Sequence, residues 1–124
     1  MRLTFDVLFV ADWLNLYNNG FTGPIPSDLR WRHMFYFDVG YNQLTGQLPD
    51  DLGDDFARLR HLHLDHNQFS GTLPTSYIRV GGGRLESLTV DHNQLGGAVP
   101  SNFVFTHKLG KKYAMLGSCT LCFE

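Results

Sequence analysis

Apolar and polar positions alternate in a pattern that recurs four times along this chain of 124 residues. Each copy reads apolar-x-apolar-x-x-Asn-x-apolar-x-Gly-x-apolar-Pro, where x is a variable residue. The copies are LNLYNNGFTGPIP from Leu14, FDVGYNQLTGQLP from Phe37, LHLDHNQFSGTLP from Leu62 and LTVDHNQLGGAVP from Leu88. Successive asparagines of the pattern are 23, 25 and 26 residues apart. This spacing predicts a solenoid, in which each copy forms one coil and neighbouring coils bury a shared core.

The elements of one coil follow from the spacing of its apolar residues. The two apolar residues before the Asn alternate with variable ones, and this period of two predicts a short strand. Other apolar residues, eight before the Asn and two and six after it, are expected to point inward as well. A fifth, degenerate copy is predicted at the end, with Tyr113 and Met115 in the strand and Ser118 in place of the Asn. The expected fold is an α/β solenoid: a right-handed leucine-rich repeat coil of about five repeats, with a parallel sheet on its concave side. We expect one domain over residues 1–124.

The recurring polar and special residues have structural roles. An Asn amide both donates and accepts, so buried asparagines can form a ladder between coils. The Gly suits an unusual φ, and the Pro, which has no N–H, ends the strand-like segment before it. Short helical or 3₁₀ turns are expected between each Pro and the next strand. The residues assigned to this frame are Asn19, Asn42, Asn67, Asn93, Gly23, Gly46, Gly71, Gly97, Pro26, Pro49, Pro74 and Pro100.

Charge and cysteine content narrow the classes of partner. The formal charge is −2, with no basic stripe along the chain, which argues against nucleic acid as a partner. No apolar run is long enough to cross a bilayer, and residues 1–10 are interpreted as the remains of a repeat rather than a signal peptide. Cys119 and Cys122 form a C-x-x-C pair without the second pair that a zinc site needs. A small disulfide and two free thiols both remain open.

The repeat form L-x-L-x-x-N-x-L-x-G-x-I-P resembles the plant- and algal-type leucine-rich repeat (LRR) of receptor-kinase ectodomains and polygalacturonase-inhibiting proteins. The resemblance covers nearly the whole chain. It implies a second short sheet in the Gly-x-apolar-Pro segment, ligand binding on the concave face, no catalysis, no cofactor, and an extracellular or organelle-lumen location. The chain enters directly into a repeat, without the family's cysteine-bearing cap. We therefore expect either a fragment of a longer protein or a first coil that another chain covers.

The variable strand positions form columns across the concave face, because neighbours in a parallel sheet lie about 4.8 Å apart. The first coils carry aromatic and amide side chains, which suit a protein partner or could stack on sugar rings. They could equally do no more than cover strand edges. The later coils carry histidine and aspartate. The residues predicted to bind a partner are Trp13, Tyr17, Tyr36, Asp38, Tyr41, His61, His63, Asp65, His66, Asp91 and His92.

The histidines and aspartates also raise a metal hypothesis, since Asp65 and Asp91 should be neighbours and repel each other unless a cation or proton lies between them. A solvated polar strip produced by repeat duplication explains the same residues, so no metal site is predicted. A nucleophile–base–acid triad is weaker still, since no serine or cysteine is expected in this part of the face.

The preferred function is a non-catalytic protein–protein interaction module that binds its partner on the concave face. One alternative is a structural accessory subunit of a larger assembly. Another is a binder of polysaccharide or of an ordered surface such as ice. Ice binding needs a regular Thr or Ser array, for which only Thr22, Thr45, Ser70 and Thr72 are candidates.

Overall fold

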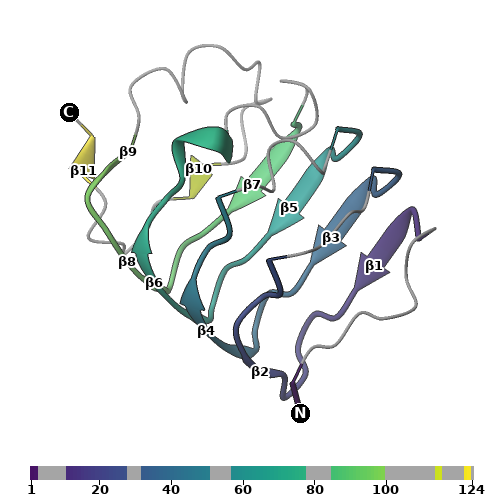
Figure 1. Cartoon of the computed structure of the whole chain (residues 1–124), viewed down its shortest axis with the longest axis horizontal. Coiled ribbons are helices and arrows are strands. Elements are labelled where there is room, and N and C mark those ends of the chain that lie inside the picture. Colours follow the sequence, from purple (N-terminus) through teal and green to yellow (C-terminus); the bar gives the residue numbers. More distant parts are fainter. Residues whose placement is uncertain are drawn as a thin grey trace.

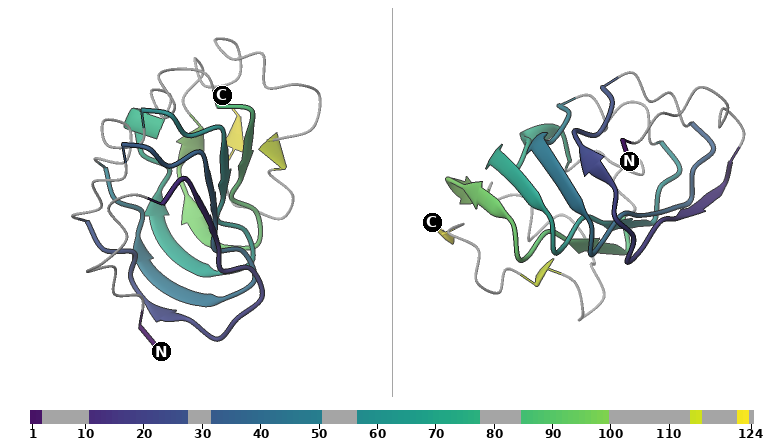
Figure 2. Two further views of the ribbon diagram at one scale, coloured as in Figure 1. Left: turned by 90° about the vertical axis from the view of Figure 1, so that its right-hand side faces the viewer. Right: turned by 90° about the horizontal axis from the view of Figure 1, so that it is seen from below.

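The computed structural model describes residues 1–2, 11–27, 32–50, 57–77, 85–99, 114–115 and 122–123. Two rows of short parallel strands run along the coil (Figure 1). The two further views in Figure 2 show the coils lying one behind another in chain order, from purple to green. The repeat therefore builds one coil per copy, as its spacing predicts.

The first row is a five-stranded sheet with the order β1-β3-β5-β7-β10 (Figure 1). Each strand pairs in parallel with the equivalent strand of the next coil, so that Leu14 faces Phe37, Phe37 faces Leu62 and Leu62 faces Leu88. The predicted strand register is confirmed at these positions. The outward side of this sheet, together with the turn after each strand, forms the predicted concave face. The strands are β1 (Trp13–Asn15), β3 (Tyr36–Asp38), β5 (His61–His63), β7 (Ser87–Thr89) and β10 (Ala114–Met115).

The second row is a four-stranded parallel sheet with the order β2-β4-β6-β8. In β4 and β6 the strand begins at the residue after the Asn and ends before the apolar-Pro pair, which is earlier than the Gly-x-apolar-Pro segment that the resemblance implies. The shift follows from the Asn, whose side chain turns the chain and leaves the next residue extended. The strands of this row are β2 (Thr22–Gly23), β4 (Gln43–Gln47), β6 (Gln68–Thr72) and β8 (Gln94–Gly96), and a separate pair joins β9 (Ala98–Val99) to β11 (Cys122–Phe123).

The core lies inside the coil and consists of the apolar frame residues. Every apolar frame position of the second and third repeats is at most 4% exposed, and the apolar frame positions of the fourth repeat from Leu85 to Leu95 are at most 5% exposed. The first coil is less covered: Leu14 and Leu16 are only partly buried against this core. The described core residues are Ile25, Met34, Phe37, Val39, Leu44, Leu48, Leu59, Leu62, Leu64, Phe69, Leu73, Tyr77, Leu85, Leu88, Val90 and Leu95.

The asparagine ladder is present. The Asn67 side chain accepts from Leu44 N (3.0 Å) in the previous coil and donates to Val39 O (2.9 Å) in that coil and to Leu64 O (3.2 Å) in its own. Asn42 and Asn93 repeat this arrangement. Each amide thus satisfies backbone groups in two coils at once.

Two backbone positions of each repeat have positive φ. The frame glycines Gly23, Gly46, Gly71 and Gly97 have φ between 81° and 83°, which confirms the unusual φ predicted for them. The residue before each Asn also lies in the left-handed region, with φ between 52° and 56°, which the sequence did not predict. Those residues are Asn18, Tyr41, His66 and His92.

The side of the coil opposite the first sheet carries one 3₁₀ turn within the described ranges, at residues 75–77, where such a turn is predicted. No helix among the described residues is long and apolar enough to cross a membrane. Pro100, Ser118, Cys119 and the side chain of Cys122 lie outside the described part of the chain, and so does the predicted disulfide.

Candidate functional site

Exposed aromatic side chains occupy the first two coils of the concave face. Trp13 stacks flat on Tyr36 of the next coil, with ring centroids 3.9 Å apart and an interplanar angle of 3°. Tyr17 lies against Tyr41 at 5.2 Å. Trp13, Tyr17 and Tyr41 are 59%, 48% and 43% exposed, so their rings remain available to a partner. The sheet register brings together Trp13 and Tyr36, which share one column, and Tyr17 and Tyr41, which stand in adjacent columns.

A hollow of about 390 Å³ adjoins this aromatic group where β1 and β3 begin. The repeat pattern does not predict this hollow, because the repeats share no residue type at the position before each strand. Backbone pairing continues through that position, with Phe35 N donating to Asp12 O (2.7 Å) and Arg60 N donating to Phe35 O (2.9 Å). Aligning the residues one position before each strand would have shown the mixed aromatic and charged side chains that line it. The hollow is lined by Asp12, Trp13, His33, Phe35, Arg58 and Arg60.

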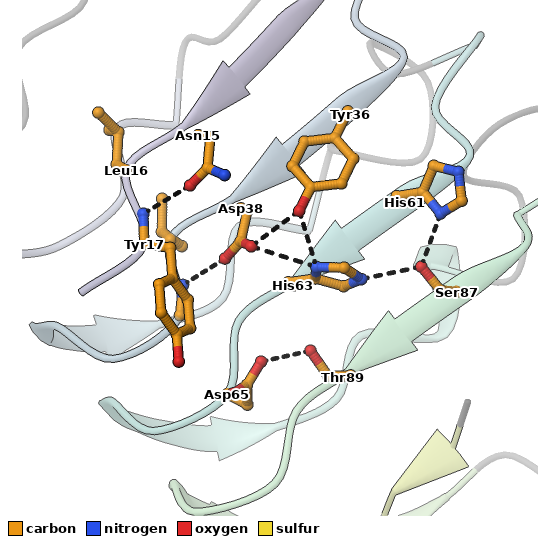
Figure 3. A network of polar contacts seen from close by, with 12 residues as sticks. Asn15, Leu16, Tyr17, Tyr36, Asp38, His61, His63, Asp65, Ser87 and Thr89 are labelled. Atoms are coloured by element: carbon orange, nitrogen blue, oxygen red, sulfur yellow. Dashed lines mark hydrogen bonds and ion pairs between the residues drawn. The ribbon is translucent and has the colours of Figure 1, made fainter. Parts of the chain in front are cut away.

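A chain of polar contacts crosses the middle of the face (Figure 3). Asp38 Oδ2 accepts from the Tyr36 hydroxyl (3.0 Å) and lies 3.3 Å from His63 Nδ1. His63 Nε2 lies 2.9 Å from Ser87 Oγ, which is also 2.9 Å from His61 Nδ1. A carboxylate can only accept, so His63 Nδ1 donates to Asp38, His63 Nε2 accepts from Ser87, and Ser87 Oγ accepts from His61. These contacts join three coils.

Gly40 allows the carboxylates beside this chain to come close. A Cβ at this position would lie 3.1 Å from Asp38 Oδ1, 3.2 Å from Asp65 Oδ1 and 3.4 Å from the Tyr17 ring. Its N–H donates to Asp38 Oδ1 (2.9 Å). The missing side chain therefore makes room for the network.

The network shifts the pKa values of its members. Burial by itself would raise the pKa of Asp38, but hydrogen bonds from His63, Gly40 N and Tyr36 together outweigh burial and lower it below the ordinary value. Burial and the Asp38 carboxylate raise the pKa of Tyr36 to about 12. Burial, opposed by Glu86 and aided by His63 and Arg60, lowers the pKa of His61. The network thus favours an ionised Asp38 and a neutral His61.

The order Asp38–His63–Ser87 is that of a nucleophilic triad, so the expectation that no serine lies in this part of the face is wrong. Ser87 reaches His63 because β7 pairs beside β5, with Ser87 opposite His61. Ser87 is only 6% exposed, and two imidazoles share its hydroxyl. A substrate carbonyl has no open approach to it, and we assign the network a structural role.

A second histidine group lies on the turn after the strands. His66 Nδ1 is 3.1 Å from Asp65 Oδ2, and His92 Nδ1 is 2.7 Å from Asp91 Oδ2. The two imidazoles stack at 4.0 Å, and Tyr41 stacks on His66 at 3.8 Å. The left-handed backbone at these three residues projects their rings side by side.

Two predicted binding residues lie deeper than expected. Asp38 is 5% and Asp91 is 7% exposed, because neighbouring side chains of the face fold over them. They support the face from beneath, and their contact with a partner stays a prediction. The remaining predicted residues are half-buried or exposed on this face, namely Trp13, Tyr17, Tyr36, Tyr41, His61, His63, Asp65, His66 and His92.

Replacing Asp38 by asparagine is expected to lower the free energy of unfolding at pH 7 by about 1–3 kcal/mol, because a charge-assisted hydrogen-bond acceptor is lost. The lowered pKa of Asp38 stabilises the fold above the ordinary carboxyl pKa of 3.8, and this contribution is lost as the pH falls through the folded-state value. The difference between the two proteins should therefore shrink below pH 3.8, as measured by urea denaturation. The exposed Asp12→Asn is the control, and identical midpoints for wild type and Asp38→Asn at pH 7 would contradict the prediction.

Comparisons with known proteins agree with this architecture. The family model described as Leucine Rich Repeat matches residues 12–31 and 58–78. Receptor-like protein 45 of Arabidopsis thaliana is 40% identical over 68 residues, covering 54% of this chain and 7% of the relative. The LRR ectodomain of the receptor kinase SOBIR1 from Arabidopsis thaliana superposes with a TM-score of 0.70 at 29% identity, over 82% of this chain and 53% of the other. The ectodomain of the Arabidopsis receptor kinase HAESA, solved with a peptide hormone ligand, has a TM-score of 0.65 at 30% identity, over 77% of this chain and 16% of the other.

The fold and its repeated face define a solenoid of the leucine-rich repeat class. The chain carries leucine-rich repeats that are similar to those of plant receptor-like proteins and receptor-kinase ectodomains. It spans a tenth or less of the length of the curated relatives it matches.

Proposed function

We propose that this chain is a non-catalytic binding module that recognises a peptide or protein partner on its concave face. The observation that carries the proposal is the exposed aromatic group of the first two coils, made of Trp13, Tyr17 and Tyr41 with Tyr36 beneath Trp13. Aromatic side chains that stay exposed beside one another are the usual anchors of protein interfaces.

The geometry of the aromatic group suits an extended chain better than a compact ligand. Its rings lie on two neighbouring coils, and the hollow beside Trp13 adds charged groups of both signs, Asp12 and Arg58 among them. An extended partner that crosses the strands would meet aromatic anchors first and polar side chains at the rim, which is the common anatomy of an interface.

The comparisons support a peptide or protein as the partner. The similar HAESA ectodomain was solved in complex with a peptide hormone, and a further similar structure is the complex of BIR3 with SERK2, at 31% identity. We infer an extracellular location for this chain from the same ectodomain relatives. The chain could also be an accessory subunit of a larger assembly or a fragment of a longer protein. Both alternatives concern what surrounds the module and are compatible with this function.

An ordered surface such as ice is a poorer fit. In the second sheet Thr45 pairs with Gln68, and Ser70 pairs with Gln47 and Gln94. The Thr and Ser residues therefore do not stack into the regular array that such a surface requires.

A triple variant with Trp13, Tyr17 and Tyr41 changed to alanine tests the proposal. We expect affinity for any partner recovered with the wild-type chain to fall at least 30-fold, since hot-spot aromatics each contribute about 2 kcal/mol or more. Tyr36 is left intact because it also bonds to Asp38. The measurement is a pull-down from extracts of the source organism, followed by titration of the recovered partner.

The matched control changes the exposed Gln43, Gln68 and Gln94 to alanine, one per coil on the neighbouring turn. This control should bind as the wild type does. Equal affinity of the aromatic triple variant and the wild type, with both folded by circular dichroism, would refute binding through the aromatic group.

A further inference from the structure

The turn after β5 and the turn after β7 bring two histidines and a carboxylate together. His66, Asp91 and His92 each offer one ligand atom, and these atoms all lie within 4.8 Å of one another. We propose that these three residues bind a divalent transition-metal ion such as Zn²⁺. The site adjoins the aromatic group, since Tyr41 stacks on His66, but zinc binding does not depend on the proposed function.

The ligand types select the metal. Two imidazole nitrogens and one carboxylate oxygen suit Zn²⁺, Ni²⁺ or Cu²⁺, whereas Ca²⁺ and Mg²⁺ prefer a shell of oxygen ligands. Three protein ligands also leave a fourth tetrahedral position for water or for a donor atom from a partner. The site therefore differs from the Asp65–Asp91 cation that the sequence raised as a hypothesis.

Asp65 is unsuited to bind the ion because both of its oxygens are engaged. Thr89 Oγ1 donates to Asp65 Oδ1, and His66 Nδ1 lies beside Asp65 Oδ2. In Asp91, by contrast, Oδ2 is near His92 and Oδ1 has no hydrogen-bond partner among the residues that the structure describes. Asp91 thus has an uncommitted oxygen, and Asp65 serves to orient His66, in the way that second carboxylates orient metal-binding imidazoles.

The three ligands can close around an ion without rebuilding the backbone. In a tetrahedral site with bonds of about 2.1 Å, two ligand atoms lie about 3.4 Å apart, so separations of up to 4.8 Å must shorten by at most about 1.4 Å. The imidazoles are already side by side at 4.0 Å. The His92 side chain is 52% exposed, which leaves the site open to ions from solution.

The other histidine group of the face is a weaker candidate. His63 bonds to Asp38 and Ser87 through its two ring nitrogens, and His61 shares the same Ser87 hydroxyl. A metal ion bound there would have to break hydrogen bonds that already satisfy both ring nitrogens of His63. At His66 and His92 it would displace fewer hydrogen bonds.

Calorimetric titration of the full chain with ZnCl₂ tests the site. We carry Cys119→Ser and Cys122→Ser in every protein, because thiolates also bind zinc. We expect one Zn²⁺ per chain, and at least tenfold weaker binding in His66→Asn and in His92→Asn. Asparagine is chosen because Asn18 occupies the equivalent left-handed position in the first coil, so both variants should fold.

A His33→Asn variant is the control, since His33 is exposed and outside the cluster; its affinity should equal that of the parent. A second measurement is the thermal midpoint, which Zn²⁺ should raise in the parent and control but not in either cluster variant. No heat on titration would overturn the proposal. Zinc binding of equal affinity in the parent and in both cluster variants would show adventitious binding and would overturn it as well.

Discussion

Asn67→Ala is expected to lower the free energy of unfolding by about 3–5 kcal/mol, the largest effect of any polar substitution in this chain. The Asn67 side chain is only 8% exposed and bonds to backbone groups of two coils. Alanine would leave Leu44 N without its side-chain acceptor in the interior, and an unsatisfied buried group costs about 1–3 kcal/mol. It would also remove the Asn67 bonds to Val39 O, which keeps its bond from Asn42, and to Leu64 O and Asp65 O, at about 1 kcal/mol or less each. Urea denaturation followed by circular dichroism measures the loss.

Asn19→Ala is the matched comparison, because Asn19 has the same place in the first repeat. Its side chain is exposed and donates to Leu16 O and Tyr17 O in its own coil. Removing it should cost about 1 kcal/mol or less, since water replaces the lost partners. Equal losses at the two positions would show that links between coils are not what makes the ladder stabilising.

Leu62→Ala is expected to cost about 3–4 kcal/mol, since it removes a wholly buried side chain and leaves a cavity. Leu62 lies in the central strand of the first sheet, with Phe37 on one side and Leu88 on the other. In a solenoid each coil is stabilised chiefly by its two neighbours, so a change in the middle weakens two interfaces. The urea midpoint should fall while the slope of the transition stays the same.

Leu14→Ala provides the control at the same repeat position in the first coil. Leu14 is only partly buried against the core, so about half the cost is expected. The same loss at Leu14 and Leu62 would mean that the first coil is covered as fully as the central one. The comparison therefore also measures how strongly the first described coil belongs to the folded unit.

The concave face divides into two parts along the coil. The exposed aromatic group belongs to the first two coils, and the cluster of His66, Asp91 and His92 belongs to the third and fourth. The two parts meet where Tyr41 stacks on His66, and the polar network around Asp38 and His63 lies on the strands beside them. A partner that extends across the coils could contact both parts, so the aromatic and histidine variants should be tested separately.

The register of the first sheet could be predicted because each strand pairs with the equivalent strand of the next repeat. Once Leu14 is equivalent to Phe37, the pairing of Trp13 with Tyr36 follows without further information. The buried apolar residues of the frame could be predicted equally well, since one coil cannot cover its own apolar side. The hollow near Phe35 could not be predicted, because the repeats share no residue type at the position before each strand. The left-handed φ before each Asn was not predicted either, because the residue type there varies from Asn18 to Tyr41 to His66 and tyrosine gives no sign of that conformation.

The sequence by itself determined the coil, its strands and the columns of the concave face, because these depend on a periodic pattern of burial that each repeat carries locally. Only the tertiary structure decided which side chains of those columns are open. Asp38, which was predicted to bind a partner, and Ser87 are both buried, and His63 of the neighbouring coil, 25 and 24 positions away, contacts each of them. Side-chain rotation and contact between coils are non-local, so the exposed aromatic group and the clustered histidines become visible only when the coils are stacked.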